Sequence, residues 1–234
     1  MHNQLSVVII SKNEEKFIAN AVKSALFSDE VLILDSGSTD NTCAIAQQLG
    51  AKVLHQDWLG FGAQKNKAVE LASNDWVFVL DSDERITAEL QSEILSTLQD
   101  PNANGYYIAR LNNFFGKYIR HCGLYPDYSV RLFNRQKGMF NNVPVHESVQ
   151  IQGNTDKLKN HMIHLAYETT DEFKVKQKRY ASLSHKKRNR LKAFISPVWT
   201  FFKLYFIKLG FLDGWHGFTI AKLYAQYTFW KYIK

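Results

Sequence analysis

The stretch Trp76–Glu84, which reads WVFVLDSDE, is the feature that most constrains how this chain can fold. Five large apolar residues run directly into two carboxylates, and such a run is typical of a strand buried on both faces of a helix-covered parallel sheet. In these sheets ligands bind beyond the carboxyl ends of the strands, where Asp81 and Asp83 emerge. Neighbouring carboxylates repel each other unless a cation lies between them, and a divalent cation that also takes phosphate oxygens meets this need. The stretch therefore predicts a metal–diphosphate site, with an ordinary surface turn as the alternative.

The first 100 residues alternate between strand and helix patterns. Apolar runs at 5–10, 31–34 and 51–55 predict three further strands, and the segments between them carry apolar residues at helical spacing. This alternation is typical of a parallel, doubly wound sheet. The second strand also ends on a carboxylate, Asp35, which such a sheet brings to the same edge as Asp81. The sequence has neither the glycine fingerprint of a dinucleotide-binding fold nor a Walker-type phosphate loop.

An acidic body is followed by a basic, aromatic tail. Residues 1–172 hold 15 Lys and Arg against 21 Asp and Glu, whereas residues 173–234 hold 14 basic residues and one acid, Asp213. Such a split indicates two functions in one chain. No base-reading motif accompanies the basic tail, so we expect no nucleic-acid partner. Two distant cysteines and an N-terminus without a signal-peptide pattern favour a cytoplasmic setting.

The tail has the pattern of helices that lie on a membrane. Ser196-Pro197 predicts the start of one helix, Gly210 and Asp213-Gly214 a break, and residues 215–232 a second helix. The apolar run from residue 199 to 209 is shorter than the ~20 residues that a spanning helix needs. Because lysines lie among its aromatics, we expect the tail to bind an anionic membrane surface peripherally, at the inner face of the cytoplasmic membrane. The alternative is that these aromatics pack on the catalytic domain or on a second subunit.

Three segments in this order resemble the family 2 glycosyltransferases, inverting sugar-nucleotide enzymes with a single GT-A domain. They are Val7–Glu14 (VVIISKNE), Asp35–Asp40 (DSGSTD) and Asp81–Asp83 (DSD). The resemblance implies an α/β fold, a Rossmann-like, mostly parallel sheet flanked by helices, here with a C-terminal helical extension. The whole chain looks like the subgroup that adds glucose to the heptose of the lipopolysaccharide inner core.

The domain organisation that we expect combines this resemblance with the charge split. The glycosyltransferase domain spans residues 1–170, with a nucleotide-sugar half at 1–100 and an acceptor-facing half at 101–170. The basic helical extension spans residues 171–234.

The resemblance also implies which residues bind the donor, a UDP-sugar. Asp35 would contact the uracil, and Ser11 and Glu14 would form the rim around the nucleoside. Lys65 stands where the family often has an arginine near the nucleotide, and Asp81 would face the ribose. The chain departs from the family at residue 12, where a lysine replaces the aromatic that frequently lies against the base.

The same resemblance implies which residues bind the metal and which one acts as the catalytic base. Asp83 would hold Mg²⁺ or Mn²⁺, and a later histidine, His164, would reach the metal. Glu147 is the nearest match to the catalytic base, and Asp127 is its competitor. The implied reaction is a direct displacement at the anomeric carbon, in which the metal and Lys65 stabilise the departing diphosphate while a carboxylate takes the acceptor proton.

The acceptor site is the least specified. His146 and Arg131 are candidates for contacts to a lipid-linked oligosaccharide of the lipopolysaccharide core, although Arg131 could instead simply pair with an acid. Two other functions fit parts of the pattern. A magnesium-dependent phosphohydrolase would also use an Asp-x-Asp after a strand, and a non-catalytic membrane-surface protein would explain the tail but not the carboxylates.

Overall fold

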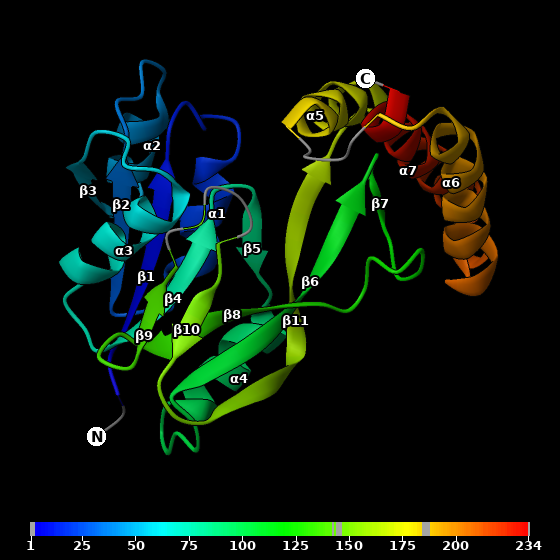
Figure 1. The fold of residues 1–234 in the computed structure, drawn as a ribbon. Coiled ribbons are helices and arrows are strands. Elements are labelled where there is room, and N and C mark those ends of the chain that lie inside the picture. The colour runs from blue at the N-terminus through cyan, green and yellow to red at the C-terminus, as the bar shows by residue number, and fades with distance from the viewer. Residues whose placement is uncertain (1–2, 142, 144–146, 184–187, 234) are drawn as a thin grey trace. The chain divides into compact units, whose positions relative to one another are not determined.

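The chain divides into two compact units (Figure 1). The computed structural model describes residues 3–141, 143, 147–183 and 188–233. The first unit comprises Met1–Arg110 and Tyr128–His164, and the second comprises Leu111–Asp127 and Leu165–Lys234. The change near residue 165 lies close to the expected end of the first domain at residue 170. Residues 111–127, however, group with the C-terminal helices, although they lie within the range 1–170.

A mixed sheet with a parallel half forms the frame of the first unit. In the described ranges the strand order is β3-β2-β1-β4-β8-β6-β11-β5, with β7 paired to β6, and β10 pairs separately with β9. The bounds are β1 Leu5–Ser11, β2 Glu30–Asp35, β3 Lys52–His55, β4 Trp76–Asp81, β5 Glu84–Ile86, β6 Gly105–Phe114, β7 Lys117–Tyr118, β8 Asp127–Asn134, β9 Gly138–Phe140, β10 Val149–Ile151 and β11 Thr155–Tyr167. Strands β3, β2, β1 and β4 run parallel, and β8 joins β4 antiparallel. The predicted α/β class and the parallel strands are therefore confirmed.

Helices cover both faces of the parallel strands, which explains the uninterrupted apolar runs. Four helices belong to this unit: α1 Ile18–Ala25, α2 Thr42–Gln48, α3 Phe61–Leu71 and α4 Ala88–Thr97. Val7 and Ile9 of β1 enter a core with apolar residues of α1, α2 and α4, whereas Val8 enters a second core with residues of α3. All three side chains have no solvent exposure, as expected for a strand covered on both sides.

The register of the central strands brings the predicted carboxylates together. Strand β1 lies between β2 and β4, with Ser11 opposite Asp35 and Ile10 opposite Asp81. Parallel strands end at the same edge of a sheet, so the residues that follow β1, β2 and β4 share one ligand-binding edge.

The second unit is helical, with α5 Thr170–Leu183, α6 Arg190–Phe202 and α7 Trp215–Ile233, and with two short turns, η1 Lys203–Ile207 and η2 Gly210–Asp213. The predicted helix start at Ser196-Pro197 is wrong, because α6 begins at Arg190 and contains Pro197. The side chain of Asn189 caps this helix by accepting a hydrogen bond from the Lys192 backbone N–H at 2.9 Å. Packing against α7 outweighs the local cost of an internal proline, about 3 kcal/mol in an isolated helix. The predicted break before α7 is confirmed.

Asp213 ties this break to residues 117–121. Its carboxylate accepts a hydrogen bond from the His121 backbone N–H at 2.9 Å, and its other oxygen lies 3.1 Å from His121 Nδ1. The ammonium of Lys117 donates to the Asp213 carbonyl at 2.8 Å. Asp213, the single acid of the tail, is thus buried and fully engaged inside the second unit.

Candidate functional site

Asp35 ends β2, and its carboxylate closes the turn that follows. One oxygen accepts hydrogen bonds from the backbone N–H groups of Gly37 at 2.8 Å and Ser38 at 2.7 Å. The other oxygen accepts from the hydroxyls of Ser11 and Ser38. Burial raises the pKa of Asp35, but the four donors outweigh it and hold the pKa below its usual value. The carboxylate is therefore ionised and fixed at the sheet edge, and only 4% of the residue remains exposed.

Negative charge accumulates next to this turn. Glu14 is half-buried, and burial together with the neighbouring carboxylate of Asp83 raises the pKa of Glu14. A hydrogen bond from Ser82 opposes this rise, and Asp40 and Asp81 add smaller repulsive contributions. Glu14 ends the first of the three family-like segments and Asp83 ends the third, and the fold makes these two carboxylates neighbours. A cation at this edge would relieve the repulsion between them.

Asp81 lies between two buried cations. Its Oδ1 is 2.9 Å from Lys65 Nζ, and its Oδ2 is 3.0 Å from Arg131 Nη2. Burial alone would raise the pKa of Asp81, but Lys65 and Arg131 hold it well below its usual range. Because both oxygens are paired with protein cations, Asp81 has little negative charge to offer a metal.

Glu84, which was not predicted as a site residue, forms an ion pair with Arg131 behind Asp81. Glu84 has no solvent exposure; its Oε2 accepts a hydrogen bond from the Asp81 backbone N–H at 2.9 Å, and its Oε1 accepts one from Arg131 Nη2 at 2.6 Å. Arg131 is 4% exposed and also donates to the Val79 carbonyl at 3.3 Å. The acceptor contact predicted for Arg131 does not fit this position, because its guanidinium is used inside the protein. The alternative reading of Arg131, as the partner of an acid, describes what is observed.

Lys65 joins the strand edge to the predicted base. It projects from α3, is 5% exposed, and its Nζ lies 2.9 Å from Glu147 Oε1 as well as 2.9 Å from Asp81. Burial lowers the pKa of Lys65, but the carboxylates of Asp81 and Glu147 raise it overall, so the ammonium stays charged. Two residues predicted for donor binding are thus connected to the one predicted for proton transfer. His146 lies outside the described residues.

Asp83 and His164 come together across two paired strands. Strand β5 pairs with β11 so that His164 is opposite Glu84, and His164 Nε2 lies 3.4 Å from Asp83 Oδ2. Both side chains are partly exposed, His164 at 20% and Asp83 at 32%. Within the described ranges no cluster of three or more His, Cys, Asp or Glu side chains could hold a metal. An ion here would keep coordination positions for other oxygens, which suits a magnesium-like ion that shares substrate phosphates.

Two further residues that support the site escape sequence analysis. Gln64, fully buried in α3, donates through its amide to the Ser36 hydroxyl at 3.0 Å and to the Gln56 carbonyl at 3.2 Å, which fixes the turn after Asp35. Glu84 directly follows the Asp-Ser-Asp motif, and that adjacency is the signal that could have drawn attention to it.

Asp127, the competing base, begins β8 and belongs to the second unit.

Sequence comparison connects this arrangement to a known family. The family described as glycosyl transferase family 2 matches residues 6–155, which is more than half of the chain. The chain belongs to glycosyl transferase family 2. The matched range of this glycosyltransferase begins within β1 and contains the Asp35 turn, the Asp81–Asp83 motif and Glu147.

Relatives of this family 2 glycosyltransferase match over nearly its whole length. An uncharacterized glycosyltransferase of Rickettsia felis is 31% identical over 255 residues, covering 99% of this chain and 89% of the relative. The lipopolysaccharide core biosynthesis glycosyltransferase LpsC of Rhizobium meliloti is 29% identical over 242 residues, covering 96% and 89%. Among solved structures, residues 1–349 of S. aureus TarS align with a TM-score of 0.53 at 15% identity, covering 97% of this chain and 90% of that chain. The last similarity supports the GT-A-like fold alone.

Proposed function

We propose that this glycosyltransferase moves a hexose, glucose, from a UDP-sugar to a heptose of a lipopolysaccharide inner core, with inversion at the anomeric carbon. The observation that carries the proposal is the meeting of Asp83 with His164 at 3.4 Å beside Asp81, at the edge where β1, β2 and β4 end. A carboxylate and an imidazole that could together hold one metal ion, next to an ionised turn carboxylate, suit a nucleoside diphosphate, which needs both a cation and hydrogen-bond acceptors.

The donor half of the proposal assigns the nucleotide to the edge formed by Ser11, Glu14, Asp35, Lys65 and Asp81. The fixed Asp35 carboxylate would accept a hydrogen bond from the uracil N–H. Asp81, held rigidly by Lys65 and Arg131, would accept from a ribose hydroxyl. Preorganised acceptors of this kind lose little freedom when the donor binds, so they favour affinity and orientation.

For the metal, Asp83 and His164 are the residues that would hold Mg²⁺ or Mn²⁺. The fit rests on a partly exposed carboxylate, an imidazole nitrogen 3.4 Å away, and the excess negative charge that Glu14 adds. When bound, the ion would neutralise charge on the departing diphosphate. The ammonium of Lys65, 2.9 Å from Asp81 Oδ1, would contribute in the same sense.

Glu147 is the base in this proposal. Its carboxylate takes the proton of the attacking acceptor hydroxyl, which adds to the anomeric carbon from the face opposite the diphosphate and inverts that centre. The ion pair with Lys65 at 2.9 Å holds the carboxylate in a fixed position. Asp127 is the alternative base, and His146 is retained as a proposed acceptor contact.

The acceptor that we propose also indicates where in the cell the enzyme acts. LpsC of Rhizobium meliloti, named for lipopolysaccharide core biosynthesis, is similar over 96% of this chain, which supports a core heptose as acceptor. A lipid-linked acceptor of this kind is presented at the inner face of the cytoplasmic membrane. A cytoplasmic enzyme that binds this anionic surface peripherally through its basic tail would meet its acceptor there.

The test is transfer itself. Purified protein is incubated with UDP-glucose, Mg²⁺ and lipopolysaccharide truncated at the inner-core heptose, and the product is analysed by mass spectrometry for one added hexose. Other UDP-hexoses and acceptors without heptose serve as controls. Transfer from UDP-glucose to the heptose acceptor alone supports the proposal. Transfer only from another sugar nucleotide, or only to an acceptor without heptose, contradicts it. Release of phosphate without transfer would favour a phosphohydrolase instead.

A further inference from the structure

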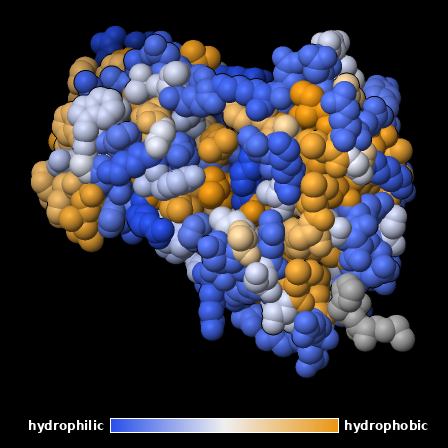
Figure 2. Space-filling view, turned by 180° about the vertical axis from the view of Figure 1, so that it is seen from behind, coloured by the Kyte–Doolittle hydropathy of each residue, from blue (hydrophilic) through white to orange (hydrophobic). Residues whose placement is uncertain are grey.

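Exposed apolar side chains concentrate on α6 and the turns that follow it. Of the 23 large hydrophobic residues that are exposed in the described part of the chain, 13 lie within residues 191–218. Figure 2 shows apolar side chains gathered along the helical edge at the left of the view. Protein surfaces usually scatter such residues singly, and a contiguous patch of them marks a site of interaction.

Helix α6 is apolar on the side that points away from its neighbour as well as on the side that packs. On the inner side Ala193 has no exposure, and the Thr200 hydroxyl lies 3.2 Å from the Thr228 hydroxyl of α7. An ordinary surface helix would carry polar residues on the opposite side. Here that side carries an apolar face with helical spacing, formed by Leu191 (71% exposed), Ile195 (59%), Val198 (71%) and Phe202 (45%).

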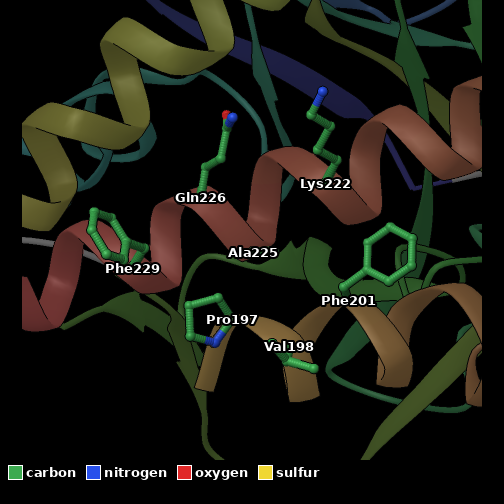
Figure 3. Close-up of a pocket in the computed structure, with 7 residues that line it drawn as sticks. All are labelled: Pro197, Val198, Phe201, Lys222, Ala225, Gln226 and Phe229. Carbon is green, nitrogen blue, oxygen red and sulfur yellow. The ribbon is translucent and has the colours of Figure 1, made fainter. Parts of the chain in front are cut away.

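This apolar face continues in two directions. Beyond α6, the turn η2 and the first residue of α7 expose Phe211 (45%), Leu212 (56%) and Trp215 (66%). Beside α6, a groove of about 460 Å³ runs between α6 and α7 (Figure 3). The groove is lined mainly by apolar side chains, with Lys222 and Gln226 of α7 as its polar members.

The charges around the apolar face have one sign. Arg190, Lys192, Lys203 and Lys208 are all exposed on or next to α6. The single acid of the tail, Asp213, is buried and paired with His121. An apolar surface bordered by cations and without an exposed acid in residues 188–233 is complementary to an anionic lipid surface, where rings lie at the headgroup boundary and ammonium groups reach phosphates. No helix in the described ranges is long and apolar enough to cross a membrane.

We propose that the apolar face of α6, together with Phe211, Leu212 and Trp215, inserts into the headgroup boundary of an anionic bilayer. The lysines beside it contact lipid phosphates. The proposal specifies which surface carries the membrane position proposed above, and it does not depend on the transferase chemistry. A second copy of the chain covering the same face is the competing occupant.

The test is co-sedimentation of the full chain with vesicles of phosphatidylglycerol and phosphatidylcholine, without donor or acceptor. The variant Ile195→Ser/Val198→Ser removes two largely exposed apolar side chains of the face (59% and 71%), of which Val198 also borders the groove against α7, and we expect its partitioning to fall about tenfold. The matched control is Val175→Ser on α5, equally exposed at 70% but outside the face, and it should bind like the wild type. Lys192→Glu/Lys203→Glu should weaken binding by about thirtyfold or more, and high salt should weaken wild-type binding.

Three results would overturn the proposal. The wild type could fail to sediment with anionic vesicles, or Ile195→Ser/Val198→Ser could bind as tightly as the wild type. The wild type could also form a dimer in light scattering that the same variant converts to a monomer, which would assign the face to a second copy. Circular dichroism melting confirms that the variants are folded. Since no sugar transfer is measured, failure here is distinguishable from failure of the proposed transferase reaction.

Discussion

Replacing Arg131 by methionine would remove the cation on which two internal carboxylates depend. Arg131 Nη2 lies 2.6 Å from Glu84 Oε1 and 3.0 Å from Asp81 Oδ2. Methionine keeps much of the side-chain volume in β8. After the change Asp81 still pairs with Lys65 at 2.9 Å, whereas Glu84 keeps the weaker attraction of His164, Arg110 at 3.7 Å and the backbone N–H of Asp81.

The expected loss can be worked from burial. Removing one partner from a buried pair costs about 3–5 kcal/mol, because the other charge is left desolvated. Glu84 has no exposure, but Asp81 is 29% exposed in its side chain and retains a second cation, so we expect the lower end, ~3 kcal/mol. That is a large share of the 5–15 kcal/mol that typically separates folded from unfolded protein.

The pH dependence has a definite sign. Burial raises the pKa of Glu84, and the positive charge of Arg131 limits that rise. In Arg131→Met the pKa of Glu84 rises further, so folding favours its protonated form. A group whose folded pKa is raised contributes stability at low pH that is lost as the pH rises through the folded pKa. The variant should therefore be closer to the wild type at pH 5 than at pH 7.

Urea unfolding followed by circular dichroism measures both quantities. The control is Lys67→Met, which breaks an exposed pair with Glu70 (2.8 Å, 33% and 67% side-chain exposure) and should cost about 0–1 kcal/mol. If Arg131→Met costs no more than Lys67→Met at pH 7, or costs more at pH 5 than at pH 7, the reasoning about this network is refuted.

Three further predictions concern the site. Asp83→Asn should abolish metal-dependent transfer while the melting temperature changes little; full transfer by the wild type in excess chelator would contradict the metal role. Glu147→Gln should lower kcat by ~10²–10⁴-fold with little change in donor affinity, and if Asp127→Asn shows this loss instead, the base is Asp127. Ser38→Ala removes a hydroxyl donor from Asp35, whose lowered pKa makes its contribution present at neutral pH and lost as pH falls. Urea unfolding should show a cost of ~1 kcal/mol at pH 7 and less at pH 3, whereas an equal cost at both pH values would contradict this.

Local patterns were enough to predict the parallel half of the sheet. Strands β1, β2 and β4 are buried on both faces, and their unbroken apolar runs indicate this burial directly. The position of Asp35 and Asp81 at one edge follows from parallel pairing alone. These parts of the site could therefore be predicted without any long-range information.

The remaining parts depend on contacts between distant segments. Arg131 reaches Glu84 because β8 pairs antiparallel with β4, with Leu132 opposite Phe78, and no local pattern specifies that pairing. Residues 111–127 group with the C-terminal helices through apolar contacts such as those of Phe114 with Phe173. Likewise, Pro197 indicates a helix start by local preference, but packing of α6 against α7 extends the helix across it.

The most direct test of the central claim is donor binding measured by isothermal titration calorimetry. UDP-glucose, other nucleotide sugars and UDP are titrated into the protein with Mg²⁺, with Mn²⁺ and with chelator, and then into Asp83→Asn. We expect a UDP-hexose to bind in the presence of either metal, and binding to be lost or greatly weakened both in chelator and in the variant. Binding that is equally tight in chelator, or no binding of any UDP-sugar with either metal, would contradict it.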